Sequence, residues 1–126
     1  GVDGWRLDVA YDYGLVLLGD ITAAAHAEKP DAWVVGEVWN YPQEWVTGER
    51  PALDGVMNMY ARRLIMEFLD AKITGGRMGR MLREMVDDMG IDAALRSWLV
   101  LDNHDTPRLK TTFPRAADRR LAQIMQ

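Results

Sequence analysis

The sequence predicts an α/β fold in which parallel strands are covered by helices. Three observations lead to this class. The 126 residues contain short apolar segments rich in β-branched residues, longer segments with apolar residues at helical spacing, and a regular alternation of the two. The chain is long enough for one domain with a sizeable core. Both a doubly wound sheet and a (β/α)8 barrel have this order of elements.

The first elements form a predicted strand–helix–strand unit. Residues 4–9 are predicted to be a buried strand. Residues 12–28 are predicted to form a helix, since their apolar positions recur at helical spacing and Pro30 follows. Residues 32–39 are a short apolar segment and are predicted to be a second strand. A strand, a helix and a strand within about 35 residues form the parallel βαβ unit.

The remainder of the chain continues the alternation. The segment 77–89 is the most regular, because its methionines and other apolar residues recur at helical spacing and indicate an amphipathic helix. We expect this methionine-rich stripe to pack the helix onto the rest of the fold, since Met fills irregular gaps. The predicted elements are a loop over 40–54, a third strand over 55–59, helices over 60–71 and 77–89, a fourth strand over 97–102, a polar loop over 103–108 and a helix over 116–126.

Composition excludes several classes of function. A net charge of −4 and a pI of about 5.1 do not suggest a nucleic-acid partner. The absence of cysteine excludes disulfides and thiolate chemistry, and with only two histidines the usual zinc ligands are missing, so no metal or cofactor is expected. No apolar segment is long enough to span a bilayer and nothing resembles a signal peptide, so no membrane partner is expected.

The two ends of the chain point to a fragment. The chain starts directly on a predicted strand and stops within a predicted helix, whereas complete domains rarely have both termini inside core elements. We therefore expect a longer protein, and we expect the isolated 126 residues to be inactive. The oligomeric state and the compartment stay open, a cytoplasmic location being favoured over a secreted one.

Acidic residues follow three of the predicted strands. Asp8 ends the first strand, Glu37 ends the second, and Asp105 follows the fourth with His104 before it. In parallel α/β folds the chemistry collects at the carboxyl ends of the strands, so these side chains are expected to converge over one rim. Taken singly, each has a structural alternative. Arg6 with Asp8 could be an ion pair that closes a strand end, Glu37 an ordinary helix-start acid, and His104 a hydrogen-bonded structural histidine.

Retaining glycosidases use two carboxyl groups about 5–5.5 Å apart, of which one is ionised and the other is protonated. Because strand side chains alternate, Arg6 and Asp8 share a face, and the guanidinium favours the ionised Asp8 as the nucleophile. Glu37 follows apolar residues and has no cation adjacent in sequence, which favours the protonated carboxyl and the role of proton donor. Asp105 is expected to hold sugar hydroxyls and to stabilise positive charge in the transition state.

Three segments carry a resemblance to a known family. "GVDGWRLDVA", "VVGEVW" and "LVLDNHDTPRL" resemble, in order, three sequence blocks of the α-amylase family, glycoside hydrolase family thirteen. The resemblance implies a partial (β/α)8 TIM barrel, roughly strands four to seven with their helices, in one catalytic domain over 1–126 that is truncated at both ends. It places Arg6 and the nucleophile Asp8 on strand four, the acid/base Glu37 on strand five, and His104 with the stabilising Asp105 on strand seven.

The resemblance also implies a substrate. It indicates retaining hydrolysis of α-glucosidic bonds in starch-like or maltodextrin substrates. Arg6 and His104 are expected to bind substrate, together with Trp39, which could instead pack locally, and Arg108, which could instead support the strand end. A transglycosylase of the same family uses the same covalent intermediate and stays open, and a non-catalytic relative with the same barrel is the less favoured alternative.

One departure from the family pattern indicates a branch. Many α-amylases follow the nucleophile with a Lys–His pair that serves an acceptor site and a calcium ion, whereas this chain has Tyr11 and Asp12 there. The absence of that pair argues against a calcium site. The segment "GWRLDVA" is more similar to the neopullulanase, cyclomaltodextrinase and maltogenic amylase branch. The preference for α-1,4 or α-1,6 linkages stays open.

Overall fold

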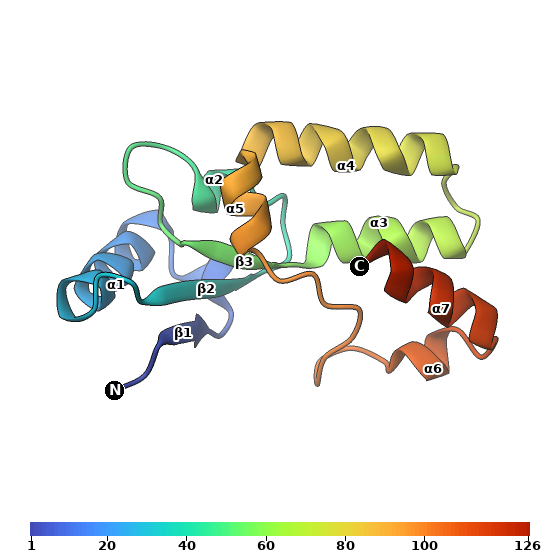
Figure 1. The fold of residues 1–126 in the computed structure, drawn as a ribbon, viewed down its shortest axis with the longest axis horizontal. Helices are drawn as coiled ribbons and strands as arrows, with labels where there is room; N and C mark the ends of the chain where they lie inside the picture. Colours follow the sequence, from blue (N-terminus) through green and yellow to red (C-terminus); the bar gives the residue numbers. More distant parts are fainter.

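The computed structural model describes all residues from Gly1 to Gln126 and contains a three-stranded sheet and helices, several of which extend beyond the sheet (Figure 1). The strands β1 (Gly4–Leu7), β2 (Trp33–Val38) and β3 (Gly55–Asn58) lie in the order β1-β2-β3. Both pairs of neighbours are parallel. The predicted alternation of parallel strands and helices is therefore confirmed for these three strands.

The longer helices lie where the apolar spacing predicts them. A 3₁₀ turn, η1 (Ala10–Asp12), precedes α1, and three short helices of four to six residues were not predicted, because they are too short for a periodic pattern. None of the helices combines the length and the apolar character needed to cross a membrane. The helices are α1 (Leu15–Glu28), α2 (Gln43–Val46), α3 (Met59–Leu69), α4 (Gly75–Met89), α5 (Ile91–Arg96), α6 (Leu109–Thr112) and α7 (Ala116–Met125).

The main core lies between the helices and one face of the sheet. The helix α4 buries Met85 and Met89 there and leaves its charged face in solvent, so the predicted methionine-rich stripe is a packing surface. The opposite face of the sheet carries Arg6, Glu37 and Met57, which contact one another. The main cluster contains Leu18, Val34, Val38, Trp45, Val46, Val56, Ala61, Met85 and Met89, among others.

Two predicted strands differ from the structure. The strand β1 ends at Leu7 rather than at residue 9, and Trp5 is 55% exposed instead of buried. The reason is that β1 is an edge strand in this sheet and that Val9 has a left-handed backbone with a φ of 46°, which extended structure does not allow.

The segment 97–102 does not form a fourth strand. It touches the sheet at one bridge, where Trp98 pairs in parallel with Met57. The pairing stops because β3 ends at Asn58 and the helix α3 begins at the next residue. Beyond the bridge, the backbone oxygen of Leu101 accepts a hydrogen bond from Arg62 Nε (2.8 Å) instead of from a neighbouring strand.

Candidate active site

The site lies at the carboxyl ends of β1 and β2. Residue Leu7 pairs with Gly36, so the next residue along each strand, Asp8 and Glu37, reaches the same level of the sheet. On the other side of β2, Glu37 pairs with Met57. Carboxyl ends of parallel strands meet at one edge of a sheet, and the register therefore brings residues distant in sequence into one cluster.

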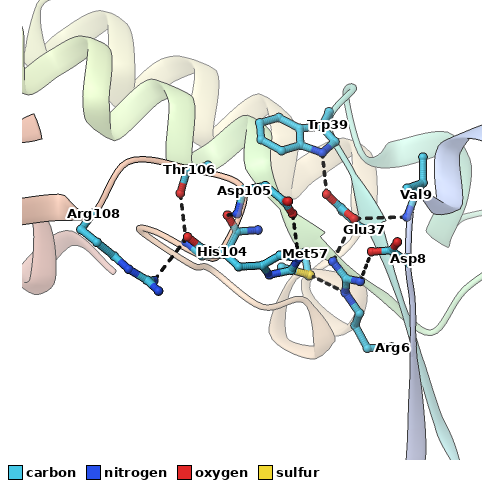
Figure 2. Close-up of polar contacts among 11 residues, drawn as sticks. Arg6, Asp8, Val9, Glu37, Trp39, Met57, His104, Asp105, Thr106 and Arg108 are labelled. Atoms are coloured by element: carbon cyan, nitrogen blue, oxygen red, sulfur yellow. Dashed lines mark hydrogen bonds and ion pairs between the residues drawn. The ribbon is translucent and has the colours of Figure 1, made fainter. Parts of the chain in front are cut away.

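Arg6 links the two carboxyl groups. Its Nη1 donates to Asp8 Oδ1 and its Nη2 donates to Glu37 Oε2 at 2.8 Å (Figure 2). The remaining donor, Nε, points to Met57 Sδ at 3.3 Å. The planar fork of the guanidinium suits this geometry, because its donors are fixed relative to one another and can hold two carboxylates together.

Glu37 is the buried member of the cluster, with 4% of its surface exposed. Its Oε2 also accepts from the backbone N–H of Val9 at 3.1 Å. Its Oε1 accepts from the indole Nε1–H of Trp39 at 2.8 Å. A buried carboxyl group needs such donors, because burial without hydrogen bonds is costly.

The contact of Arg6 with Glu37 corrects the electrostatic argument made from the sequence. That argument gave Asp8 a cation and left Glu37 without one, but the guanidinium touches both groups. Neighbours in sequence did not reveal this contact, because it joins residues on adjacent strands. The two carboxyl groups differ instead in their exposure to solvent. The Asp8 side chain is 65% exposed and that of Glu37 is 5% exposed.

The charge on Asp8 is favoured by its neighbours. The hydrogen bond from Arg6 is the main cause that lowers the pKa of Asp8 below its usual value. The positive charge of Arg6 lowers the pKa of Asp8 further, and the lowering effects together outweigh the opposing loss of solvent. The ionised carboxylate that a nucleophile requires is thus the favoured form of Asp8.

His104 and Asp105 reach the site from the loop after Trp98. Their side chains pair at 3.1 Å and both are largely exposed. Figure 2 shows the pair on the side of Glu37 and Met57 that faces away from β1. The loop is held by its own polar residues, since Asp105 N–H donates to Asn103 Oδ1 at 3.2 Å and Asn103 N–H donates to Thr106 Oγ1 at 2.9 Å.

Arg108 does not join the cluster. Its Nη1 donates to Asp102 Oδ1 at 3.0 Å and to the backbone oxygen of Asn103 at 3.3 Å, so its charge is used within its own loop. Asp102 also accepts from the N–H of Leu109 at 2.7 Å, and this bond is the main cause of the lowered pKa of Asp102. Of the predicted substrate-binding residues, the structure brings Arg6, His104 and Trp39 to the carboxyl groups and leaves Arg108 apart (Figure 2).

Sequence reasoning missed two contributors to the site. Val9 supplies a backbone N–H, which no side-chain pattern reveals, and Met57 supplies a sulfur acceptor from β3. The glycine at position 36 does indicate that the chain turns at Val9 and packs against β2. A Cβ atom there would lie 2.8 Å from the Cβ of Ala10, so the chain after Asp8 can fold back onto the sheet only where β2 has a glycine.

A cavity also opens away from this site. A cavity of about 1360 Å³ opens between α1 and α5, and it is lined by His26, Asp54 and Arg96 together with apolar side chains. Asp20, Asp54 and Asp92 line it, but neither of its arginines, Arg50 and Arg96, bridges two carboxyl groups as Arg6 does at the strand ends. The structure holds no group of three or more His, Asp and Glu side chains placed as metal ligands.

Comparisons with known proteins agree with this geometry. No protein-family model matches the chain. The chain is 33% identical over 122 residues to neopullulanase 2 of Thermoactinomyces vulgaris and 32% identical over 111 residues to an intracellular maltogenic amylase of Bacillus subtilis. These alignments cover 89% and 87% of this chain but 19% and 18% of the relatives, so the chain spans about one-fifth of their length.

Solved structures match over nearly the whole chain. The cyclic α-maltosyl-(1→6)-maltose hydrolase of Arthrobacter globiformis in complex with maltose is 31% identical with a TM-score of 0.83, over 99% of this chain and 28% of that chain. A cyclomaltodextrinase is 29% identical with a TM-score of 0.86, over 100% of this chain and 22% of that chain. These neighbours are TIM-barrel enzymes. The chain belongs to the α-amylase family, glycoside hydrolase family thirteen, in the branch that contains maltogenic amylases, neopullulanases and cyclomaltodextrinases.

Proposed function

We propose that residues 1–126 correspond to the region of strands four to seven of a catalytic (β/α)8 barrel, with the segment 97–102 at the position of the seventh strand, and that the full-length enzyme is a retaining hydrolase of α-glucosidic bonds. The single observation that carries the reaction type is the bridge made by Arg6. It holds the carboxyl groups of Asp8 and Glu37 together at one edge of the sheet. Retaining glycosidases place two carboxyl groups close together, so that one of them attacks C1 directly.

The first step forms a covalent intermediate. An ionised oxygen of Asp8 attacks C1 of an α-linked glucosyl unit, and the bond from C1 to the glycosidic oxygen breaks. Glu37 gives its proton to the departing oxygen, which leaves as a hydroxyl. The lowered pKa of Asp8 supports this assignment, since the Arg6 hydrogen bond keeps the nucleophile charged at neutral pH.

The second step releases the sugar. Glu37, now ionised, takes a proton from a water molecule while the oxygen of that water attacks C1 from the opposite side. The bond between C1 and Asp8 breaks, and both carboxyl groups return to their starting state. Two inversions at C1 give a product with the α configuration of the substrate.

The other residues of the cluster bind the substrate in this proposal. Asp105 and His104 lie on an exposed loop on the Met57 side of Glu37, where the Asp105 carboxylate can accept from sugar hydroxyls and face the positive charge of the transition state. Trp39 is 40% exposed and offers an aromatic surface above Glu37. Arg108 is left out of the binding role because Asp102 holds it.

The substrate class follows the neighbours. One solved relative is a hydrolase of cyclic α-maltosyl-(1→6)-maltose and was solved with maltose and with that cyclic sugar. Two curated relatives are a cyclomaltodextrinase and a neopullulanase. We infer that the full-length enzyme accepts short or cyclic α-glucans.

Replacing the nucleophile tests the proposal. In the full-length enzyme, Asp8→Asn should lower kcat on maltotriose or a cyclomaltodextrin by at least about a thousandfold, because the covalent intermediate cannot form. The measurement is the release of reducing sugar, and proton NMR of the first product should show the α-anomer for the unmodified enzyme.

The matched control is Asp87→Asn, since Asp87 is an exposed acid on α4 with no side-chain partner. It should keep kcat within about twofold. Normal turnover by Asp8→Asn, or the β-anomer as the first product, would refute the proposal.

A further inference from the structure

The two oxygens of Glu37 are not equivalent. A carboxylate oxygen has about two acceptor positions. Oε2 uses both, since it accepts from Arg6 Nη2 at 2.8 Å and from the N–H of Val9 at 3.1 Å. Oε1 uses one, since it accepts only from Trp39 Nε1 at 2.8 Å. Within this chain, the free acceptor position of Glu37 is therefore on Oε1.

We propose that Oε1 is the atom that carries the transferred proton and that Trp39 is a positioning residue, whose indole N–H holds Oε1 so that its free lone pair points at the glycosidic oxygen. This inference rests on the proposed acid/base function of Glu37. It gives Trp39 a task that differs from stacking on a sugar, because the working atom is the indole nitrogen and not the ring face.

The geometry around Oε2 supports the assignment. Val9 is a β-branched residue with φ 46° and ψ 39°, a backbone conformation that such residues rarely adopt. That conformation directs its N–H to Oε2. A proton on Oε2 would have to displace either this donor or the Arg6 guanidinium, whereas a proton on the free position of Oε1 displaces nothing.

The sequence places Trp39 correctly for this task. It follows Glu37 by two residues at the end of β2, and strand side chains two apart point to the same side. Figure 2 shows the indole lying over the carboxyl group, on the side away from Arg6 and Asp8. The charged groups around Glu37 are Arg6 and Asp8 from the first strand, and the pair of His104 and Asp105 from the later loop.

The test separates proton donation from substrate binding. In the full-length enzyme, Trp39→Phe keeps an aromatic ring and removes the N–H. Hydrolysis of maltotriose needs a protonated leaving group, and its kcat should fall roughly tenfold to a hundredfold. The initial release of fluoride from α-maltosyl fluoride needs no proton donor and should change less than about twofold.

A pH profile gives a second reading. The hydrogen bond from the Trp39 N–H favours the ionised form of the carboxyl group that accepts it, and Trp39→Phe removes this bond. The alkaline limb of kcat/KM for maltotriose should therefore move to higher pH in Trp39→Phe. A tryptophan that acts only by stacking would raise KM for both substrates and leave this limb in place.

The matched control is Trp45→Phe, because the buried Nε1 of Trp45 has no hydrogen-bond partner. It should leave the ratio of the two rates unchanged. Both rates are measured on one preparation, so partial loss of folded enzyme also leaves the ratio unchanged. If Trp39→Phe does not fold, 3-benzothienylalanine at position 39 replaces the N–H by sulfur in a ring of the same shape.

Two failures can be told apart. Glu37→Gln should abolish hydrolysis of maltotriose and retain the initial fluoride release; if both persist, the proposed function is wrong. If Glu37→Gln behaves as expected while neither variant at position 39 changes the ratio of rates, the proposed function stands and the inference about Trp39 is wrong.

Discussion

The two ends of the sheet use carboxylates in different ways. At the amino end, Asp54 precedes β3 and accepts from the backbone N–H of Val34 at 2.8 Å and from His26 Nε2 at 3.0 Å. At the carboxyl end, Asp8 and Glu37 share the guanidinium of Arg6. Both ends therefore join acidic groups to nitrogen donors in a partly buried setting.

The difference lies in what the donors belong to. Asp54 accepts from the backbone of the neighbouring strand and so holds the start of β2 in place. This contact serves the fold. At the carboxyl end the donors are mainly side chains, the two carboxyl groups lie beside each other, and one of them is open to solvent. A cavity lined by Asp54 lies near the amino end, whereas the Arg6 bridge lies at the carboxyl end.

The largest effect should come from breaking the bridge at the carboxyl end. Arg6→Lys keeps the charge and loses the fork that reaches both carboxyl groups. In the full-length enzyme, kcat/KM on maltotriose should fall about a hundredfold to a thousandfold, because the carboxyl groups lose their relative position.

A suitable control is Arg63→Lys, since Arg63 is an exposed residue of α3 that stacks on Tyr60 outside the cluster. Its kcat/KM should stay within about twofold. Equal losses for the two arginine variants would remove the distinction between the two ends of the sheet.

An intermediate effect, on stability alone, is expected at the amino end. Asp54→Ala leaves the N–H of Val34 without its acceptor and should lower the free energy of unfolding by about 1–3 kcal/mol, measured by urea denaturation. The kcat of the folded enzyme should not change. Asp31→Ala serves as the comparison, because the Asp31 side chain is 82% exposed, and it should change stability by less than about 0.5 kcal/mol. A loss of kcat in Asp54→Ala would argue that the amino end takes part in catalysis.

The smallest effect is expected at Asp102, a carboxylate that, like Asp54, accepts a hydrogen bond from the backbone. The hydrogen bond from Leu109 N–H lowers the pKa of Asp102. Because this pKa is lower in the folded state than the unfolded value of about 3.9, the ionised group stabilises the fold above about pH 4. The stabilisation is lost as the pH falls through the folded pKa.

In Asp102→Asn, the free energy of unfolding should therefore fall less steeply as the pH is lowered, by about 1 kcal/mol or less. The measurement is the midpoint of thermal unfolding at several pH values between 3 and 6. The unmodified enzyme at the same pH values is the reference. A stability profile that Asp102→Asn leaves unchanged would show that this carboxylate does not hold the loop.

Much of the fold was predictable from local patterns. The apolar spacing of residues 77–89 predicted α4, and the apolar segment at 32–39 predicted β2, because each pattern reports which face of a single element is buried. The prediction of a strand at 97–102 was wrong, since a strand also requires a partner, and β3 turns into α3 after Asn58. An apolar segment by itself says nothing about where its neighbour ends.

The sequence by itself determined the first strand–helix–strand unit, the longer helices, the carboxyl-end positions of Asp8 and Glu37, and the family. Only the tertiary structure decided that Arg6 holds Glu37 as well as Asp8, that the backbone of Val9 donates to Oε2, and that Arg108 turns away to Asp102. The physical reason is that periodicity reports the burial of each residue along its own element. Hydrogen-bond partners from separate strands and loops depend on register and on the path of the backbone, and those are set only when the elements pack together.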